Sequence, residues 1–259
     1  MNRLHARFKA KQGRLLSIYL TAGYPTSADT VPLIQALDQA GVDVLEVGMP
    51  FSDPLADGTT IQHTSEQALA GGITIPKYFE QVKAAREVSD IPMVFMGYLN
   101  QVYRMGAEAF CQACKDAGID AVIVPDLPME VYQSELAELF AEYGLPMCFL
   151  ITPQTSEERI RKAAELSGGF LYVVADNSIT GSKQGLSNAQ QAYFERIQNM
   201  ALPGVKLIGF GISDKDSFDT ACNYAQGAIV GSAFLRHVAQ GTDAAHIRGF
   251  VQTLRPDNS

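Results

Sequence analysis

The chain alternates short apolar runs with helix-like segments about eight times, and this alternation constrains its fold more than any other feature. Eight such βα units without a long linker predict an α/β fold, a (β/α)8 or TIM barrel formed as one domain over residues 1–259. The expected strands are Leu15–Thr21, Val42–Gly48, Pro92–Tyr98, Ala121–Pro125, Met147–Thr152, Phe170–Ala175, Lys206–Gly209 and Ala228–Gly231.

Helical periodicity is clearest in the segment Glu130–Tyr143, which stops at Gly144. A second helix is expected over Ser156–Ser167, with a capping hydroxyl at its start. Near the N-terminus, Leu4 and Phe8 are four residues apart, which predicts a short helix before the first strand.

A doubly wound open sheet is the alternative fold. That fold would be favoured by a G-x-G-x-x-G turn after the first strand, and Thr21–Pro25 does not supply one. The barrel is therefore expected, with its active residues at the carboxyl ends of the strands.

Charge and hydropathy narrow the function classes. The net charge of −8 argues against a nucleic-acid or anionic-membrane surface, and no apolar stretch reaches the roughly 20 residues of a membrane span. No apolar signal-peptide segment follows the basic N-terminus, so we expect a soluble, cytoplasmic protein.

Cysteine and histidine spacing predicts no metal site. Cys111 and Cys114 fit one face of a helix, and neither a second C-x-x-C motif nor a histidine pair accompanies them. We expect all four cysteines, these two with Cys148 and Cys222, to be reduced core thiols.

Glu46 is the first candidate catalytic residue, because it lies inside an apolar strand. Side chains alternate along a strand, so Leu45 and Val47 would face the helices while Glu46 points into the barrel. The alternative is a structural glutamate paired with arginine, but no Arg or Lys lies between residues 43 and 75. Partial desolvation would raise the pKa of Glu46 and suit proton transfer near neutrality.

The loop after this strand, FSDPLADG, adds Asp53 and Asp57. Either could be an ordinary turn residue, since Asp-Pro and Asp-Gly are common turn dipeptides. The length of the loop and its position beside Glu46 favour a functional role, more for Asp57 than for Asp53. Two carboxyl groups in different surroundings indicate that one acts as an acid while the other acts as a base.

Glycines at the ends of the last two strands indicate an anion site. Gly209–Ser213 and Gly227–Ala233 leave backbone N–H groups open, and a helix is expected to start at Ser232. Consecutive loops of this kind form the usual phosphate site of such barrels, although tight strand-to-helix turns also require glycine. The polar segment 176–187 is either a connector or a lid that excludes water.

Aromatic residues end four different strands: Tyr19, Tyr98, Tyr172 and Phe210. Each alone is typical of a core residue. Together they would form a flat, apolar pocket beside the acids, suited to an aromatic substrate.

These motifs resemble the alpha-subunit family of tryptophan synthase from about Leu15 to about Val238. The most specific element is E-x-G-x-P-F-S-D-P-x-A-D-G, from Glu46 to Gly58. The supporting elements are Tyr98–Asn100, Pro125–Pro128, Thr180–Gly181, Gly209–Ser213 and Gly227–Ser232. The chain departs from the family pattern at Thr59, where proline is common, and within the lid.

The resemblance implies a lyase of tryptophan biosynthesis that splits indole-3-glycerol phosphate into indole and glyceraldehyde 3-phosphate. It makes Glu46 the acid–base and Asp57 the acceptor of the indole N–H, with Thr180 orienting Asp57. Gly181, Gly211, Gly231 and Ser232 would hold the phosphate, and the indole pocket would consist of Tyr19, Tyr98, Ile123, Leu150, Tyr172 and Phe210.

The resemblance also implies a partner, the beta subunit, in an α2β2 assembly, with Asp53 at the interface. No cofactor is expected in this chain, and pyridoxal phosphate is expected in the partner. Two alternatives stay open: another phosphate-binding barrel, such as indole-glycerol-phosphate synthase or a phosphosugar epimerase, and a non-catalytic subunit that activates a partner.

Overall fold

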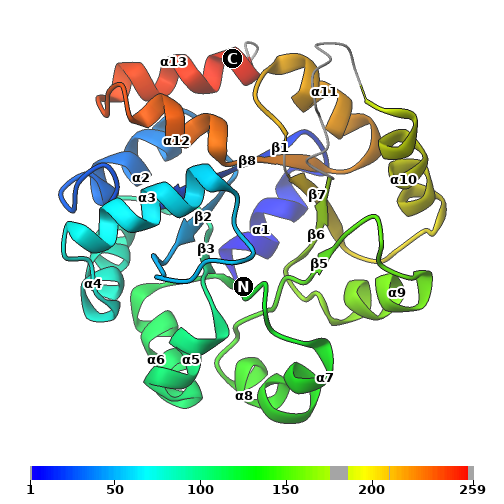
Figure 1. Ribbon diagram of the computed structural model, residues 1–259, viewed down its shortest axis with the longest axis horizontal. Helices are drawn as coiled ribbons and strands as arrows, with labels where there is room; N and C mark the ends of the chain where they lie inside the picture. The colour runs from blue at the N-terminus through cyan, green and yellow to red at the C-terminus, as the bar shows by residue number, and fades with distance from the viewer. Residues whose placement is uncertain (1, 176–185, 210, 256–259) are drawn as a thin grey trace.

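The computed structural model describes residues 2–175, 186–209 and 211–255, and it shows parallel strands surrounded by helices (Figure 1). The strands follow the order β4-β3-β2-β1-β8-β7-β6-β5. Their bounds are β1 (Leu15–Thr21), β2 (Val44–Gly48), β3 (Met93–Met96), β4 (Ala121–Ile123), β5 (Leu150–Ile151), β6 (Phe170–Val174), β7 (Val205–Gly209) and β8 (Gly227–Val230).

The two edges of this sheet meet just before β5. The N–H of Val122 in β4 donates to the carbonyl of Pro146 over 3.0 Å, and the N–H of Cys148 donates to the carbonyl of Val122 over 2.8 Å. This parallel bridge closes the ring, because it joins β4 to the segment that leads into β5. The predicted barrel is confirmed, and the open-sheet alternative is wrong.

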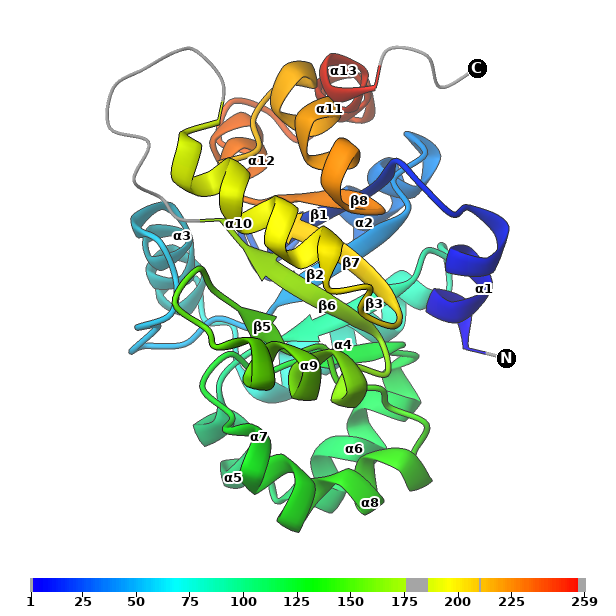
Figure 2. The same cartoon turned by 90° about the vertical axis from the view of Figure 1, so that its right-hand side faces the viewer.

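The helices of the described chain cover the outside of the strands, and one of them covers an end. Figure 2 shows α1 at one end of the barrel, away from α3. The bounds are α1 (Arg3–Ala10), α2 (Thr30–Gln39), α3 (Thr59–Ala70), α4 (Ile75–Arg86), α5 (Leu99–Met105), α6 (Ala107–Ala117), α7 (Met129–Val131), α8 (Ala137–Glu142), α9 (Glu157–Leu166), α10 (Asn188–Asn199), α11 (Lys215–Tyr224), α12 (Ser232–Val238) and α13 (Ala244–Leu254).

Alternation along the strands divides the apolar core into two layers. In β2, Val44 belongs to the inner cluster, while Leu45 and Val47 belong to the outer cluster between strands and helices. Leu4 of α1 is fully buried in the inner cluster and closes that end of the barrel. The expected short N-terminal helix is therefore confirmed, and the barrel interior is packed below the site.

The predicted helix Glu130–Tyr143 is present but not regular. A π-helical turn, Tyr132–Leu136, separates α7 from α8. Within it, the hydroxyl of Ser134 donates to the carbonyl of Glu130 over 3.0 Å, so a side chain competes for the helical backbone acceptor. The periodicity predicted the helix correctly, but it carried no sign of the wider turn.

Cysteine burial follows the expectation at three of four positions. Cys111, Cys114 and Cys148 are buried free thiols, whereas Cys222 is only half-buried, so its assignment to the core was wrong in degree. Within the described ranges, no helix combines the length and hydropathy needed to cross a membrane.

Candidate active site

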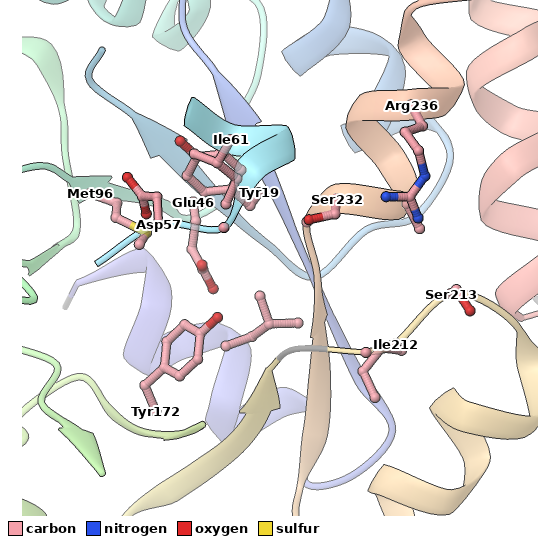
Figure 3. A pocket seen from close by; sticks show the side chains of 15 residues that line it. Tyr19, Glu46, Asp57, Ile61, Met96, Tyr172, Ile212, Ser213, Ser232 and Arg236 are labelled. Atoms are coloured by element: carbon pink, nitrogen blue, oxygen red, sulfur yellow. The ribbon is translucent and has the colours of Figure 1, made fainter. Parts of the chain in front are cut away.

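A cavity of about 270 Å³ opens at the carboxyl ends of the strands (Figure 3). Glu46 and Asp57 lie on one side of it, and Ser213, Ser232 and Arg236 lie on the other. Its described lining is Tyr19, Glu46, Asp57, Gly58, Ile61, Met96, Tyr172, Gly211, Ile212, Ser213, Ile229, Gly231, Ser232, Ala233 and Arg236.

Glu46 points into the barrel from β2 and is completely buried. The hydroxyl of Ser17 donates to its Oε1 over 2.9 Å, and its Oε2 has no hydrogen-bond partner among the described residues. The ion pairs within the described chain leave Glu46 out, so the structural glutamate–arginine alternative is not what the structure shows. Burial raises the pKa of Glu46 to about 8, against the opposing effect of the Ser17 hydrogen bond.

Asp57 lies at the end of the loop after β2 and is half-buried. The phenol of Tyr98 donates to its Oδ2 over 2.9 Å, and the side-chain amide of Gln62 donates to its carbonyl over 2.9 Å. Burial raises the pKa of Asp57 to about 6, while the Tyr98 hydrogen bond lowers it. At pH 7 the free protein therefore holds a protonated Glu46 beside an ionised Asp57.

Two tyrosines form the aromatic walls, and each requires a glycine on the neighbouring strand. A Cβ at Gly48 of β2 would overlap the phenol of Tyr19, and a Cβ at Gly209 of β7 would overlap that of Tyr172. Burial raises the pKa of both phenols above the ordinary value, so both rings stay neutral. The cavity thus has flat, uncharged walls beside the two acids.

The opposite side of the cavity is polar and open to solvent. Gly211, with φ +78°, follows the end of β7, and Gly231 and Ser232 follow the end of β8. α12 starts at Ser232, as predicted, and Arg236, on the next turn, contributes a positive charge to the rim. This side has the backbone groups and the charge that an anion requires.

The structure brings together part of the predicted set. Glu46, Asp57, Tyr19, Tyr172, Gly211, Gly231 and Ser232 line the cavity. Tyr98 reaches it through Asp57, Ile123 is buried in the inner core, and Leu150 lines a separate hollow beside β5. Asp53 is exposed, and Thr180, Gly181 and Phe210 lie outside the described residues, as do 176–185 of the predicted lid.

Sequence reasoning missed Ser17 and Arg236. Ser17 precedes Tyr19 by two positions and therefore shares its strand face, which is the signal that could have identified it. Arg236 follows Ser232 by four positions, one helical turn later. The other missed lining residues, such as Ile61, Met96, Ile212 and Ile229, are ordinary apolar side chains without a distinguishing motif.

The arrangement supports acid–base chemistry on a substrate with an aromatic part and an anionic part. Across the described ranges, no cluster of His, Cys, Asp and Glu is placed to hold a metal ion. Two carboxyl groups with separated pKa values provide an acid and a base at the same pH.

Comparison with known protein families gives a match over most of the chain. The family model described as tryptophan synthase alpha chain matches residues 5–254. A tryptophan synthase alpha chain from Flavobacterium johnsoniae is 49% identical over 255 residues, covering 98% of this chain and 100% of that protein. A tryptophan synthase alpha chain from Christiangramia forsetii is 46% identical, and the alignment covers 98% of this chain and 99% of that protein.

Solved structures show the same similarity in three dimensions. A ligand-free tryptophan synthase chain from Mycobacterium tuberculosis superposes with a TM-score of 0.86 at 30% identity, covering 98% of each chain. A chain of the tryptophan synthase α2β2 complex from Pyrococcus furiosus superposes with a TM-score of 0.86 at 32% identity, covering 93% of this chain and 97% of that one.

Proposed function

This chain belongs to the tryptophan synthase alpha chain family, and we propose that its barrel, acting as one domain, cleaves indole-3-glycerol phosphate. The products are indole and glyceraldehyde 3-phosphate, formed by a retro-aldol reaction. The family match sets aside the other phosphate-binding barrels considered from the sequence.

One observation carries the assignment of roles: Glu46 and Asp57 line one cavity with pKa values near 8 and 6. Near neutral pH, Glu46 is the proton donor and Asp57 is the anionic acceptor. A retro-aldol cleavage of an indole needs both groups at once, because the ring must gain a proton at C3 while the resulting cation is stabilised.

Glu46 alone can carry both proton transfers of the proposed reaction. Its carboxylic acid gives a proton to C3 of the indole, which forms an indoleninium cation. The Glu46 carboxylate then takes the proton from the hydroxyl on the adjacent side-chain carbon, the C–C bond breaks, and its electron pair returns to the ring. Glu46 is protonated again at the end of the cycle, in agreement with a pKa of about 8.

The Asp57 carboxylate accepts a hydrogen bond from the indole N–H and stabilises the cation. Tyr19 and Tyr172 pack against the ring. Their positions on the cavity wall support these roles. The substrate phosphate binds at the opposite side, on the backbone N–H groups of Gly211, Gly231 and Ser232.

The remaining assignments rest on the family pattern. Thr180 orients Asp57, Gly181 contributes to phosphate binding, and Tyr98, Ile123, Leu150 and Phe210 complete the indole pocket. Ile123 belongs to the inner core that includes Tyr172, and Leu150 packs against that core.

The partner is the beta subunit, in an α2β2 complex like the one named for Pyrococcus furiosus. The loop after β2 supports this, since Asp53 is exposed and the side chain of Leu55 is 90% exposed. An apolar side chain so exposed, beside the active-site acid, suits a surface that a partner covers. The beta subunit carries pyridoxal phosphate, and this chain functions in the cytoplasm without a cofactor of its own.

Indole release tests the proposal. The purified chain, with and without the beta subunit, should convert indole-3-glycerol phosphate into indole and glyceraldehyde 3-phosphate, and the partner should increase the rate. Absence of cleavage under both conditions would contradict the catalytic role and favour the non-catalytic alternative.

A further inference from the structure

Ser17 is a buried hydroxyl inside the barrel that the proposed chemistry does not yet use. It lies on β1 with no exposed surface, and its Oγ donates to Oε1 of Glu46 over 2.9 Å. The register of β1 and β2 aligns Tyr19 with Glu46 and Ser17 with Val44, so Ser17 reaches Glu46 diagonally from below.

This hydrogen bond makes the two carboxyl oxygens of Glu46 different. Oε1 is bound to Ser17, whereas Oε2 is buried without a partner among the described residues, and the group points into the cavity. A buried oxygen without a partner is costly unless a ligand or a proton transfer uses it.

We propose that Ser17 is a positioning residue, whose hydroxyl holds the Glu46 carboxyl group so that Oε2 is the oxygen that exchanges protons with the substrate. The inference rests on the proposed function, since it concerns the same acid–base step. With Oε1 held as an acceptor, the acidic proton resides on Oε2, which faces the substrate before and after each turnover.

The hydrogen bond also affects acidity. A donor stabilises the carboxylate more than the neutral acid, so the Ser17 contact lowers the pKa of Glu46 while burial raises it. In the described part of the chain, the titratable neighbours of Glu46 are Tyr19, Tyr172 and Cys148; burial raises their pKa values, so they stay neutral. Among the described lining residues, the remaining charges are those of Asp57 and, at the rim, Arg236.

The test compares Ser17→Ala with wild type and with Ser17→Thr, which keeps a hydroxyl. Carbon-13 NMR of labelled glutamate carboxyl groups follows the titration of Glu46, assigned by the signal that Glu46→Gln removes. In Ser17→Ala we expect the midpoint to rise by about one pKa unit or more, and in Ser17→Thr to stay near the wild-type value.

Turnover at pH 7 separates orientation from acidity. Glu46 is mostly protonated at that pH in wild type, and a higher pKa in Ser17→Ala would only increase that fraction. A fall in kcat of about tenfold with little change in KM would therefore report lost orientation. Ser17→Thr should restore most of the rate.

Ser89→Ala is the matched control. The Ser89 hydroxyl is also buried and also donates to a carboxyl group, Oδ2 of Asp38 over 2.7 Å, but it lies between α4 and β3, away from the cavity. This control should leave the Glu46 midpoint and kcat unchanged.

An unchanged midpoint in folded Ser17→Ala would overturn the inference, and so would a shifted midpoint with an unchanged kcat. Failure of the proposed function is distinct, because it would appear as a wild-type protein that does not cleave the substrate. The carboxyl titration tests Ser17 even in that case.

Discussion

The phenol of Tyr98 donates a hydrogen bond to Oδ2 of Asp57 and accepts one, over 3.0 Å, from the N–H of Ala56. The start of α5 is thereby linked to the loop that follows β2. Tyr98 also stacks on Phe51, with ring centroids 5.0 Å apart, so its ring and its hydroxyl act on the same loop. This contact fixes Asp57 and lowers its pKa against the effect of burial.

Tyr98→Phe should raise the pKa of Asp57, because the variant keeps the ring but removes the donor that stabilises the carboxylate. In the proposed mechanism Asp57 must be ionised to accept a hydrogen bond from the indole N–H, so activity in wild type should rise with pH through about 6. The variant should move this acidic limb of the kcat/KM profile upward by about one pH unit. An unmoved limb, measured by indole release from pH 5 to 8, would contradict the role of the hydrogen bond.

Glu46→Gln should stabilise the fold at alkaline pH. The folded pKa of about 8 lies above the ordinary value of 4.5, so on raising the pH the unfolded chain loses this proton first. Stability is therefore lost as the pH rises from about 4.5 to 8, and only wild type shows that loss. In urea unfolding, the free energy of unfolding of Glu46→Gln should exceed that of wild type by a small amount at pH 5 and by about 3–5 kcal/mol at pH 9. A difference that does not depend on pH would contradict the buried, protonated state of Glu46.

Gly48→Ala should disturb the aromatic wall, because the added methyl group would occupy the position of the Tyr19 phenol. We expect a loss of stability of about 1–3 kcal/mol, typical of overpacking, and a higher KM. Gly249→Ala is the control, since nothing lies within 4 Å of its Cβ position in α13, and alanine should stabilise that helix. Equal effects of the two substitutions would argue against the steric explanation.

Arg255→Met should weaken the fold without changing the chemistry. Asp43, just before β2, is buried and accepts from Arg255 over 2.6 Å, from Lys11 over 2.7 Å and from the N–H of Leu16 over 2.9 Å. These contacts join Lys11, which follows α1, and Arg255, which follows α13, to the end of the barrel where β2 begins. Loss of Arg255 should cost about 2–4 kcal/mol, because the buried carboxylate of Asp43 loses one charged partner. Lys11 still pairs with that carboxylate and limits the cost. Urea unfolding measures the cost, and kcat at a temperature where the variant is folded should equal that of wild type.

The sequence predicted the barrel and the inward orientation of Glu46 because both follow from local patterns. Alternation in β2 alone places Glu46 on the face opposite Leu45 and Val47. Boundaries were less accurate at β3, where Gly97 and Tyr98 were expected in the strand but Tyr98 caps α5 instead.

The Ser17–Glu46 contact could not be predicted in the same way. It depends on the register between β1 and β2, and residues that are 29 positions apart meet only when that register is fixed. Tyr98 was expected in the pocket wall, but its hydroxyl binds Asp57, because the path of the loop after β2 is set by tertiary contacts. Sequence motifs thus selected two acids that line one cavity, and the fold supplied their hydrogen-bond partners.

Single-turnover cleavage by Glu46→Gln tests the central claim most directly. The amide accepts the Ser17 hydrogen bond and preserves the shape of the cavity, but it cannot exchange a proton with the substrate. We predict a folded protein that binds indole-3-glycerol phosphate and releases no measurable indole. Substantial indole formation by the folded variant would contradict Glu46 as the acid–base of this site.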